Sequence, residues 1–189
     1  MISINNLTIS LFNKDVESIK KLFYSFLGDE YEIRHNNQLM TNYSNQLYNA
    51  PVVEFVIFSP CTNPQTSVLI ANIMDGYVNL IKHISKQYNL DFYHVVISES
   101  SVQILESYQF HYYSNSQCRH ILCYQDPQWV FYETGDVLPF ENPNHYKQRI
   151  KKNRLNKGII IGYLSSLGWN IEDDNFWIPV NGFYTFSKK

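Results

Sequence analysis

The residues best suited to chemistry gather between Trp129 and Leu155, where an aromatic segment leads into an acidic turn and then into a basic run. Lys147, Lys151 and Arg154 are spaced so that a helix would place them on one face. Such a face can bind an acidic partner or a phosphate group. The alternative interpretation is a solvated outer face whose charge is balanced by nearby acidic residues.

Two glutamates precede this basic run on either side of a glycine-containing turn. Glu133 and Glu141 could serve with His145 as general acid–base groups. Alternatively, they pair with Arg149 or Arg154 and brace the turn, which is a structural role. The sequence pattern alone does not decide between these two interpretations.

The same segment supplies the candidate partner-binding residues, because aromatic side chains and arginine dominate the energetics of protein interfaces. The chain is rich in aromatic residues, with 15 Tyr, 12 Phe and 3 Trp, although these can also serve as an aromatic core. The candidates are Trp129, Tyr132, Glu133, Glu141, Tyr146, Lys147, Arg149, Lys151 and Arg154.

Sequence motifs for established catalytic and metal sites are absent. The six histidines form no HxH, HExxH or Cys/His cluster, although His111 and His120 could meet across a hairpin. No GxSxG, GxGxxG or Walker sequence occurs, and Cys61 lacks the flanking residues of a cysteine protease. We therefore expect no metal, no cofactor and no catalytic activity.

Length and composition predict one domain over residues 1–189 in the cytoplasm. The net charge of −2 argues against general nucleic-acid binding, for which a basic surface is needed. Cys61, Cys118 and Cys123 are odd in number and lack zinc-type spacing, so we expect free thiols. The N-terminus lacks the features of a signal peptide, and no apolar stretch is long enough to span a membrane.

Hydrophobic periodicity predicts an α+β fold with helices packed on a mainly antiparallel sheet. Asn13 is expected to cap a helix over 15–27 that Gly28 ends, and Asp75 and Gly76 to start a second helix. Further helices are predicted over 144–154 and 156–167, the first carrying the basic run. Strands are expected within 2–12, 31–34, 52–58, 67–71, 91–98, 108–113, 120–124 and 129–133, with a short final strand in 174–186, an exposed loop over 35–50 and irregular structure over 138–144.

The segment also carries a family resemblance. The pattern WxFYxxGxxxPFExxxxYKxRxxKxRLN, beginning at Trp129, and the stretch NIMDGYVNLIKHIS from Asn72 to Ser85 resemble small bacterial immunity proteins of contact-dependent growth inhibition and related polymorphic toxin systems. Such a resemblance implies a cytoplasmic protein that neutralises a cognate toxin domain by occluding a surface which the toxin needs. It carries over no functional residues.

Three functional hypotheses follow. The first is an immunity-type protein that binds a bacterial toxin domain and has no catalysis of its own. The second is a nucleic-acid-associated protein that uses a basic helix over 144–157. The third is an enzyme that uses Glu133, Glu141 and His145.

Overall fold

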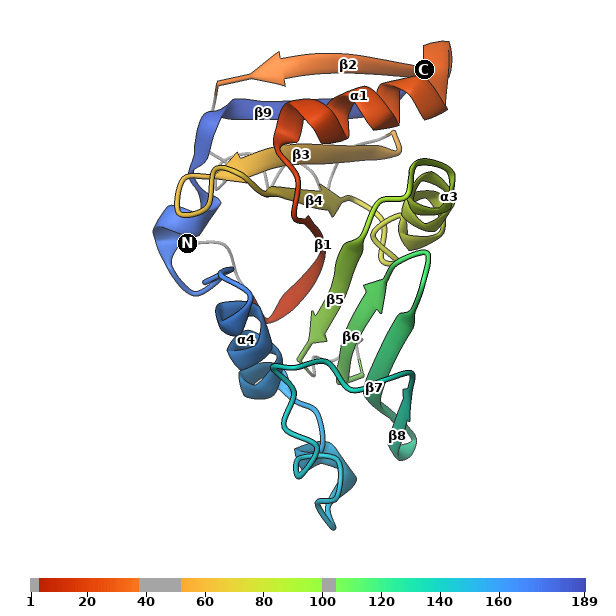
Figure 1. The fold of residues 1–189 in the computed structure, drawn as a ribbon, viewed down its shortest axis with the longest axis vertical. Coiled ribbons are helices and arrows are strands. Elements are labelled where there is room, and N and C mark those ends of the chain that lie inside the picture. The colour runs from red at the N-terminus through yellow and green to blue at the C-terminus, as the bar shows by residue number, and fades with distance from the viewer. Residues whose placement is uncertain (1–3, 38–51, 100–104) are drawn as a thin grey trace.

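The computed structural model describes residues 4–37, 52–99 and 105–189. Within these ranges nine strands form one sheet, in which every neighbouring pair is antiparallel (Figure 1). The strands are β1 (Asn6–Phe12), β2 (Tyr31–Asn36), β3 (Glu54–Pro60), β4 (Ser67–Ala71), β5 (Phe92–Ser98), β6 (Ser107–Tyr113), β7 (Cys118–Asp126), β8 (Gln128–Thr134) and β9 (Pro179–Lys188). The described helices are α1 (Val16–Leu27), α3 (Val78–Tyr88) and α4 (Lys157–Ser166), with short 3-10 turns η1 (Gly28–Glu30), η2 (Lys151–Asn153) and η3 (Asp174–Trp177).

The strand order is β2-β9-β3-β4-β1-β5-β6-β7-β8. Strands β5 to β8 form a meander in chain order. The last strand, β9, instead lies between β2 and β3 and pairs with both. The predicted short final strand is therefore a long interior strand that brings the C-terminal end of the chain between β2 and β3. The sheet-dominated α+β class is confirmed.

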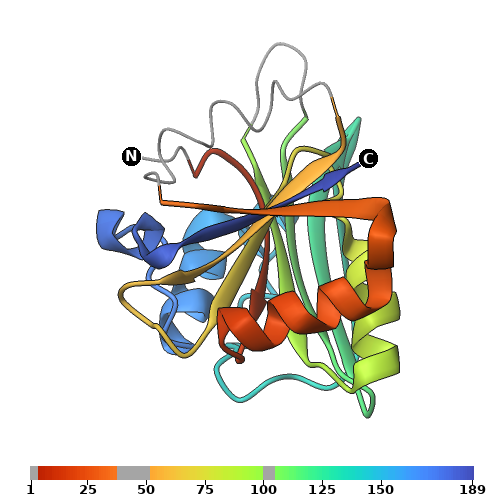
Figure 2. The ribbon, with the colours of Figure 1, turned by 90° about the horizontal axis from the view of Figure 1, so that it is seen from above.

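Helices lie on both faces of this sheet (Figure 2). α1 and α3 cover one face over a cluster of apolar side chains that includes Phe23, Phe55 and Ile84. α4 lies on the other face, where Leu164 and Trp169 belong to a larger cluster. Because side chains alternate along a strand, β1, β3, β4, β5, β6 and β9 contribute to both clusters. Strands β3 and β4 are buried along almost their whole length, as expected for interior strands covered on two sides.

The cysteines follow the alternation predicted for one strand. Cys118 is exposed and Cys123 is buried, five positions further along β7. Cys61 is exposed, and all three thiols are free. The loop predicted over 35–50 is wrong at its first two positions, because His35 and Asn36 belong to β2. Positions 38–50 of that loop lie outside the described residues.

The cap of α1 differs from the expectation. Asp15, and not Asn13, is the N-cap, because its carboxylate accepts hydrogen bonds from the Ser18 backbone N–H at 2.9 Å and the Ser18 hydroxyl at 2.6 Å. Gly28 ends the helix as predicted, with a φ of 56° that few other residues tolerate. Phe12 is the last residue of β1, so Asn13 falls in the short connection between the strand and the helix.

The helix predicted over 144–154 is wrong. This segment consists of irregular turns followed by the 3-10 turn η2. Most helical stability in proteins comes from packing an apolar face. Between Tyr146 and Leu155, which are both buried, no residue is buried, and Ile150 is 61% exposed. A helix here would have no apolar stripe to pack. The predicted helical face of Lys147, Lys151 and Arg154 therefore does not form.

Among the described helices, none combines the length and the apolar character needed to cross a lipid bilayer.

The corrected helix cap gives a direct test. Replacing Asp15 with Ala removes both bonds to Ser18, and we expect the free energy of unfolding to fall by about 1 kcal/mol. Asn13→Ala is the matched control and should change it by less than about 0.5 kcal/mol. Urea unfolding of both variants measures the difference. A larger loss for Asn13→Ala than for Asp15→Ala would contradict the assignment.

Candidate functional site

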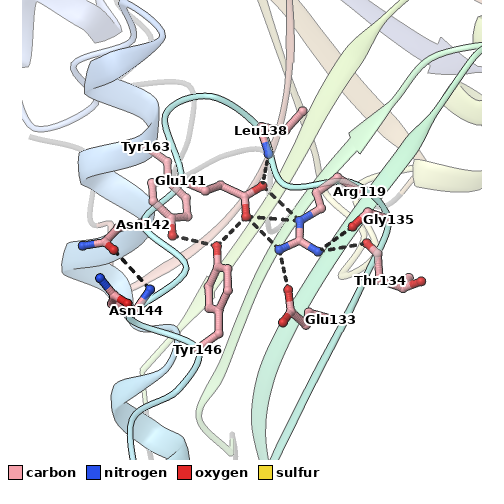
Figure 3. A network of polar contacts seen from close by, with 10 residues as sticks. All are labelled: Arg119, Glu133, Thr134, Gly135, Leu138, Glu141, Asn142, Asn144, Tyr146 and Tyr163. Atoms are coloured by element: carbon pink, nitrogen blue, oxygen red, sulfur yellow. Dashed lines mark hydrogen bonds and ion pairs between the residues drawn. The ribbon is translucent and has the colours of Figure 1, made fainter.

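A buried arginine is the centre of the polar network in Figure 3. Arg119 lies on β7, on the α4 side of the sheet, and its side chain is 2% exposed. Its Nε donates to both carboxylate oxygens of Glu141, at 3.0 and 3.1 Å, and its Nη2 donates to Glu141 Oε2 at 2.7 Å. A guanidinium fork that meets a carboxylate in this way forms a strong and geometrically specific pair.

The rest of the guanidinium is also occupied. Nη2 contacts Glu133 Oε2 on β8 at 2.5 Å. Nη1 donates to the carbonyl oxygens of Thr134 and Gly135, at 3.3 and 3.0 Å. One positive charge therefore faces two carboxylates and two carbonyl dipoles. Burial lowers the pKa of Arg119, but Glu141 and Glu133 outweigh it and raise that pKa further above its ordinary value. The guanidinium is permanently charged and fully hydrogen-bonded.

Two tyrosines extend the network to α4. Tyr146 Oη lies 2.7 Å from Glu141 Oε2 and 2.7 Å from the hydroxyl of Tyr163, which lies on α4. An ionised carboxylate can only accept, so Tyr146 donates to Glu141 and Tyr163 donates to Tyr146. Burial raises the pKa of both phenols, so both remain protonated donors. The Leu138 backbone N–H adds a further bond to Glu141 Oε1 at 3.1 Å.

Gly135 allows the chain to turn from the end of β8 towards Arg119. Its φ is 86°, and a Cβ atom at this position would lie 2.0 Å from the carbonyl oxygen of Cys118. The chain leaves β8 here, crosses close to the start of β7 and presents the Gly135 carbonyl to Arg119. We call residues 135–156 the braced loop and the Arg119–Glu133–Glu141–Tyr146–Tyr163 cluster the ionic brace.

Outer contacts fasten the far end of the braced loop to β8. The Arg154 Cζ lies 5.3 Å from the ring centre of Phe131, and its Nε donates to the Gln148 carbonyl at 2.7 Å. Lys152 lies 5.2 Å from the ring centre of Trp129 and pairs with Glu106 at 2.8 Å. Of the basic residues predicted to form a patch, Arg154 and Lys152 therefore fasten the loop to β8 and to neighbouring residues.

Among the candidate residues that the structure describes, the side chains of three exposed cations make no contact that fastens the loop: Lys147, Arg149 and Lys151. Within the described part of the chain, none of them has an ion-pair or hydrogen-bond partner for its side chain. With Ile150, they form what we call the loop tip. Tyr132 on β8 is also exposed, at 55%.

The candidate residues therefore fall into three groups. Glu133, Glu141 and Tyr146 belong to the ionic brace, and the expected pairing of Glu133 and Glu141 with Arg149 or Arg154 is wrong. Trp129 and Arg154 fasten the loop, whereas Tyr132 and the three cations of the loop tip are exposed. Both carboxylates proposed for acid–base chemistry with His145 hold Arg119.

Arg119 was missed by reasoning from the sequence, although a signal was present. In a strand, Arg119, Ile121 and Cys123 share one face, and the latter two are apolar core residues. A charged residue in such a position must be paired. The pattern therefore points to a buried ion pair, but not to its partners, which come from the braced loop.

A second polar cluster lies on the opposite face of the sheet. His94 on β5, His111 on β6 and His120 on β7 form one cross-strand row. The predicted meeting of His111 and His120 is confirmed, with their Nδ1 atoms 2.9 Å apart. Burial lowers the pKa of His94 to about 4 and that of His111 to about 3, and also lowers the pKa of His120. The two neighbouring histidines add to the shift of His111, and Lys82 adds to the shift of all three. The row is therefore uncharged at neutral pH.

No group of three or more His, Cys, Asp or Glu side chains in residues 4–37, 52–99 and 105–189 is arranged to hold a metal ion. Comparison of the chain with protein-family models, with curated proteins and with solved structures finds no match. The geometry of the two clusters is therefore the basis for a functional proposal.

The ionic brace predicts a strong asymmetry between two variants. Arg119→Met leaves the buried Glu141 carboxylate unpaired, and we expect a loss of about 3–5 kcal/mol in the free energy of unfolding. Replacing both partners, as Arg119→Met with Glu141→Leu, removes the orphan charge and should restore stability to within about 1–2 kcal/mol of the wild type. Urea unfolding measures both. Equal losses in the single and double variants would show that the buried charge is not the cause.

The histidine row predicts a dependence of stability on pH. Unfolded His94 takes up a proton near pH 6.5, whereas the folded residue does so only near pH 4. Lowering the pH through this window therefore favours the unfolded state, by on the order of 3 kcal/mol for His94 alone. His94→Asn keeps a polar group near the position of Nδ1 but does not titrate, so its stability should fall less over the same window. Urea unfolding at a series of pH values measures the two curves, and parallel curves would contradict the assignment.

Proposed function

We propose that this protein acts by binding an acidic surface of a partner protein through the loop tip. One observation carries the proposal: a buried ionic brace holds a loop whose outermost cations, Lys147, Arg149 and Lys151, have no partner in the described part of the chain. A basic loop that served only for solubility would need no such support.

The energetics of buried ion pairs favour a positioning role for the brace. Removing an arginine and a carboxylate from water costs several kcal/mol per ion, and well-packed apolar residues often give equal stability. What the brace provides is one fixed loop conformation. Binding is stronger when a loop is already ordered, because less conformational entropy is lost in the complex.

The composition of the loop tip suits a protein partner. Ile150, at 61% exposure, lies between Arg149 and Lys151 in the sequence. An apolar side chain surrounded by cations can enter a pocket while the charges meet a rim of acidic residues. A phosphate backbone would use the cations but would leave the isoleucine in water. This difference favours an acidic protein over nucleic acid.

We further propose that the partner is a toxin domain and that this chain is an immunity-type protein of the cytoplasm. The resemblance of the 129–156 pattern to immunity proteins supports this step, as does the absence of motifs for established catalytic sites. In this role the protein occludes the toxin in a one-to-one complex. The free thiols of Cys61 and Cys118 are exposed, which suits a reducing compartment.

The test is co-expression with the product of the adjacent gene, followed by co-purification and a growth-rescue assay. The wild type should form a complex and restore growth. Arg149→Glu with Lys151→Glu should weaken the complex by at least about 100-fold, since two favourable charges become two repulsive ones. Lys14→Glu with Lys21→Glu is the matched control, because both lysines are exposed and lie at or near α1, whereas the loop tip follows β8. This control should bind like the wild type.

Two outcomes would remove the proposal. If the loop-tip variant and the control bind equally well, the loop tip is not the interface. If the wild type neither binds the gene product nor restores growth, the immunity role is lost. Binding of DNA or RNA probes that falls steeply with salt would instead point to a nucleic-acid partner.

A further inference from the structure

A pocket of about 600 Å³ opens on the face of the sheet opposite to the ionic brace. Its floor is formed by side chains of β5 and β6, including His94, Ser107 and His111, and Lys82 and Val78 of α3 form one wall. None of its lining residues belongs to the braced loop, so it is a separate site from the proposed protein interface.

Along the pocket floor, each hydrogen bond has one possible donor, and the donors follow each other from His120 to Ser107. Gln109 Oε1 can only accept, so His111 Nε2 donates to it over 3.1 Å. The neutral His111 ring then has a lone pair at Nδ1, which accepts from His120 Nδ1. The Gln109 amide nitrogen donates to Ser107 Oγ at 3.1 Å, and both bonds agree with one orientation of the amide. Ser107 therefore accepts at its oxygen, and its own hydrogen is left to donate into the pocket.

His94, next to His111 on the neighbouring strand, also presents a donor to the pocket. The buried Ser10 hydroxyl lies 2.9 Å from His94 Nδ1. Among the described residues no other acceptor for the Ser10 hydrogen is within reach, so Ser10 donates to Nδ1 and the neutral ring carries its hydrogen at Nε2. His94 thus presents a second donor on the pocket side. The Asp75–Gly76 turn fixes this ring, since a Cβ atom on Gly76 would lie 3.1 Å from His94 Cε1.

Lys82 adds a positive charge to these donors. Its Nζ lies 4.7 Å from the ring centre of Tyr113, and no carboxylate in the described part of the chain pairs with it. The ammonium group is close enough to lower the pKa of all three histidines of the row. The Lys82 ammonium and the His94 imidazole N–H therefore line the same end of the pocket and lack an acceptor among the described residues. Ser107 lies further along the floor, four positions before His111 on β6.

We propose that this pocket binds a small organic carboxylate, with the carboxylate at Lys82 and His94 and an apolar body against Val78, Val96 and Leu105. A carboxylate supplies the acceptors that these two donors lack, and the charge-assisted bond to lysine is the stronger of the two contacts. The apolar side chains of the lining remove the body of the ligand from water.

The other charged groups around the pocket set its pH dependence. Asp75 also lines the pocket, where its Oδ1 accepts from the Tyr77 N–H at 3.1 Å, and it opposes an anion. Beyond the row, Arg119 is near enough to His120 to lower its pKa. A bound carboxylate stabilises imidazolium, so ligand binding and protonation of the row favour one another. Affinity should therefore rise as the pH falls from about 7.5 to about 5.5.

The experiment is NMR titration of the whole chain with benzoate, and with benzamide as its neutral counterpart. Benzoate should shift the His94 and His111 ring signals at millimolar concentration, and benzamide should bind at least about tenfold more weakly. Lys82→Met should weaken benzoate binding by about tenfold or more. Lys86→Met, one turn further along α3 at an exposed position, is the matched control and should have no effect. Asp75→Asn should strengthen binding about twofold.

Each other outcome overturns the proposal. Equal binding of benzoate and benzamide would mean that the pocket recognises only an apolar body. Loss of affinity in both lysine variants would show a general charge effect, and no ring shifts with benzoate would mean that the pocket is not a carboxylate site. Circular dichroism of Lys82→Met verifies that a loss of binding is not a loss of fold.

Discussion

The burial of one positive charge organises the α4 side of this protein. Arg119 is fixed by its place on β7 and cannot reach water, so the chain must bring acceptors to it. Glu141 arrives from the braced loop, Glu133 from β8 and two carbonyl oxygens from the turn at Gly135. The loop therefore follows the acceptor positions that the guanidinium requires, and this explains an ordered segment without regular secondary structure.

The sheet gives its two faces different chemistry. On β7, alternation sends Arg119 to the α4 side and its neighbour His120 to the α3 side. One face satisfies its charge with carboxylates and presents a basic loop tip beyond them. The other keeps its histidines neutral and leaves donors around an open pocket. The interior position of β9 ties the N-terminal and C-terminal parts of the sheet together, so both faces rest on one scaffold.

Local patterns predicted most of the elements, and long-range contacts account for what they missed. The apolar runs of β3 and β4, the helix stop at Gly28 and the helix expected over 156–167 are local signals, and the structure agrees with them. The helix over 144–154 was expected from charge spacing, but no apolar stripe supports it. The partners of Arg119 could not be predicted because Glu141 is 22 positions away and meets it only through the path of the loop. The position of β9 likewise depends on pairing with distant strands.

The central claim is that the ionic brace fixes the braced loop without being needed for the stability of the sheet. Amide hydrogen exchange in Arg119→Met with Glu141→Leu tests it most directly, because this pair removes the brace without leaving a buried charge. The amides of residue 141 and Tyr146, which donate to the carbonyls of Leu138 and Pro143, should exchange much faster than in the wild type. Amides of β5 and β6 should keep their protection. Unchanged exchange in the loop, or an equal loss across the whole sheet, would contradict the claim.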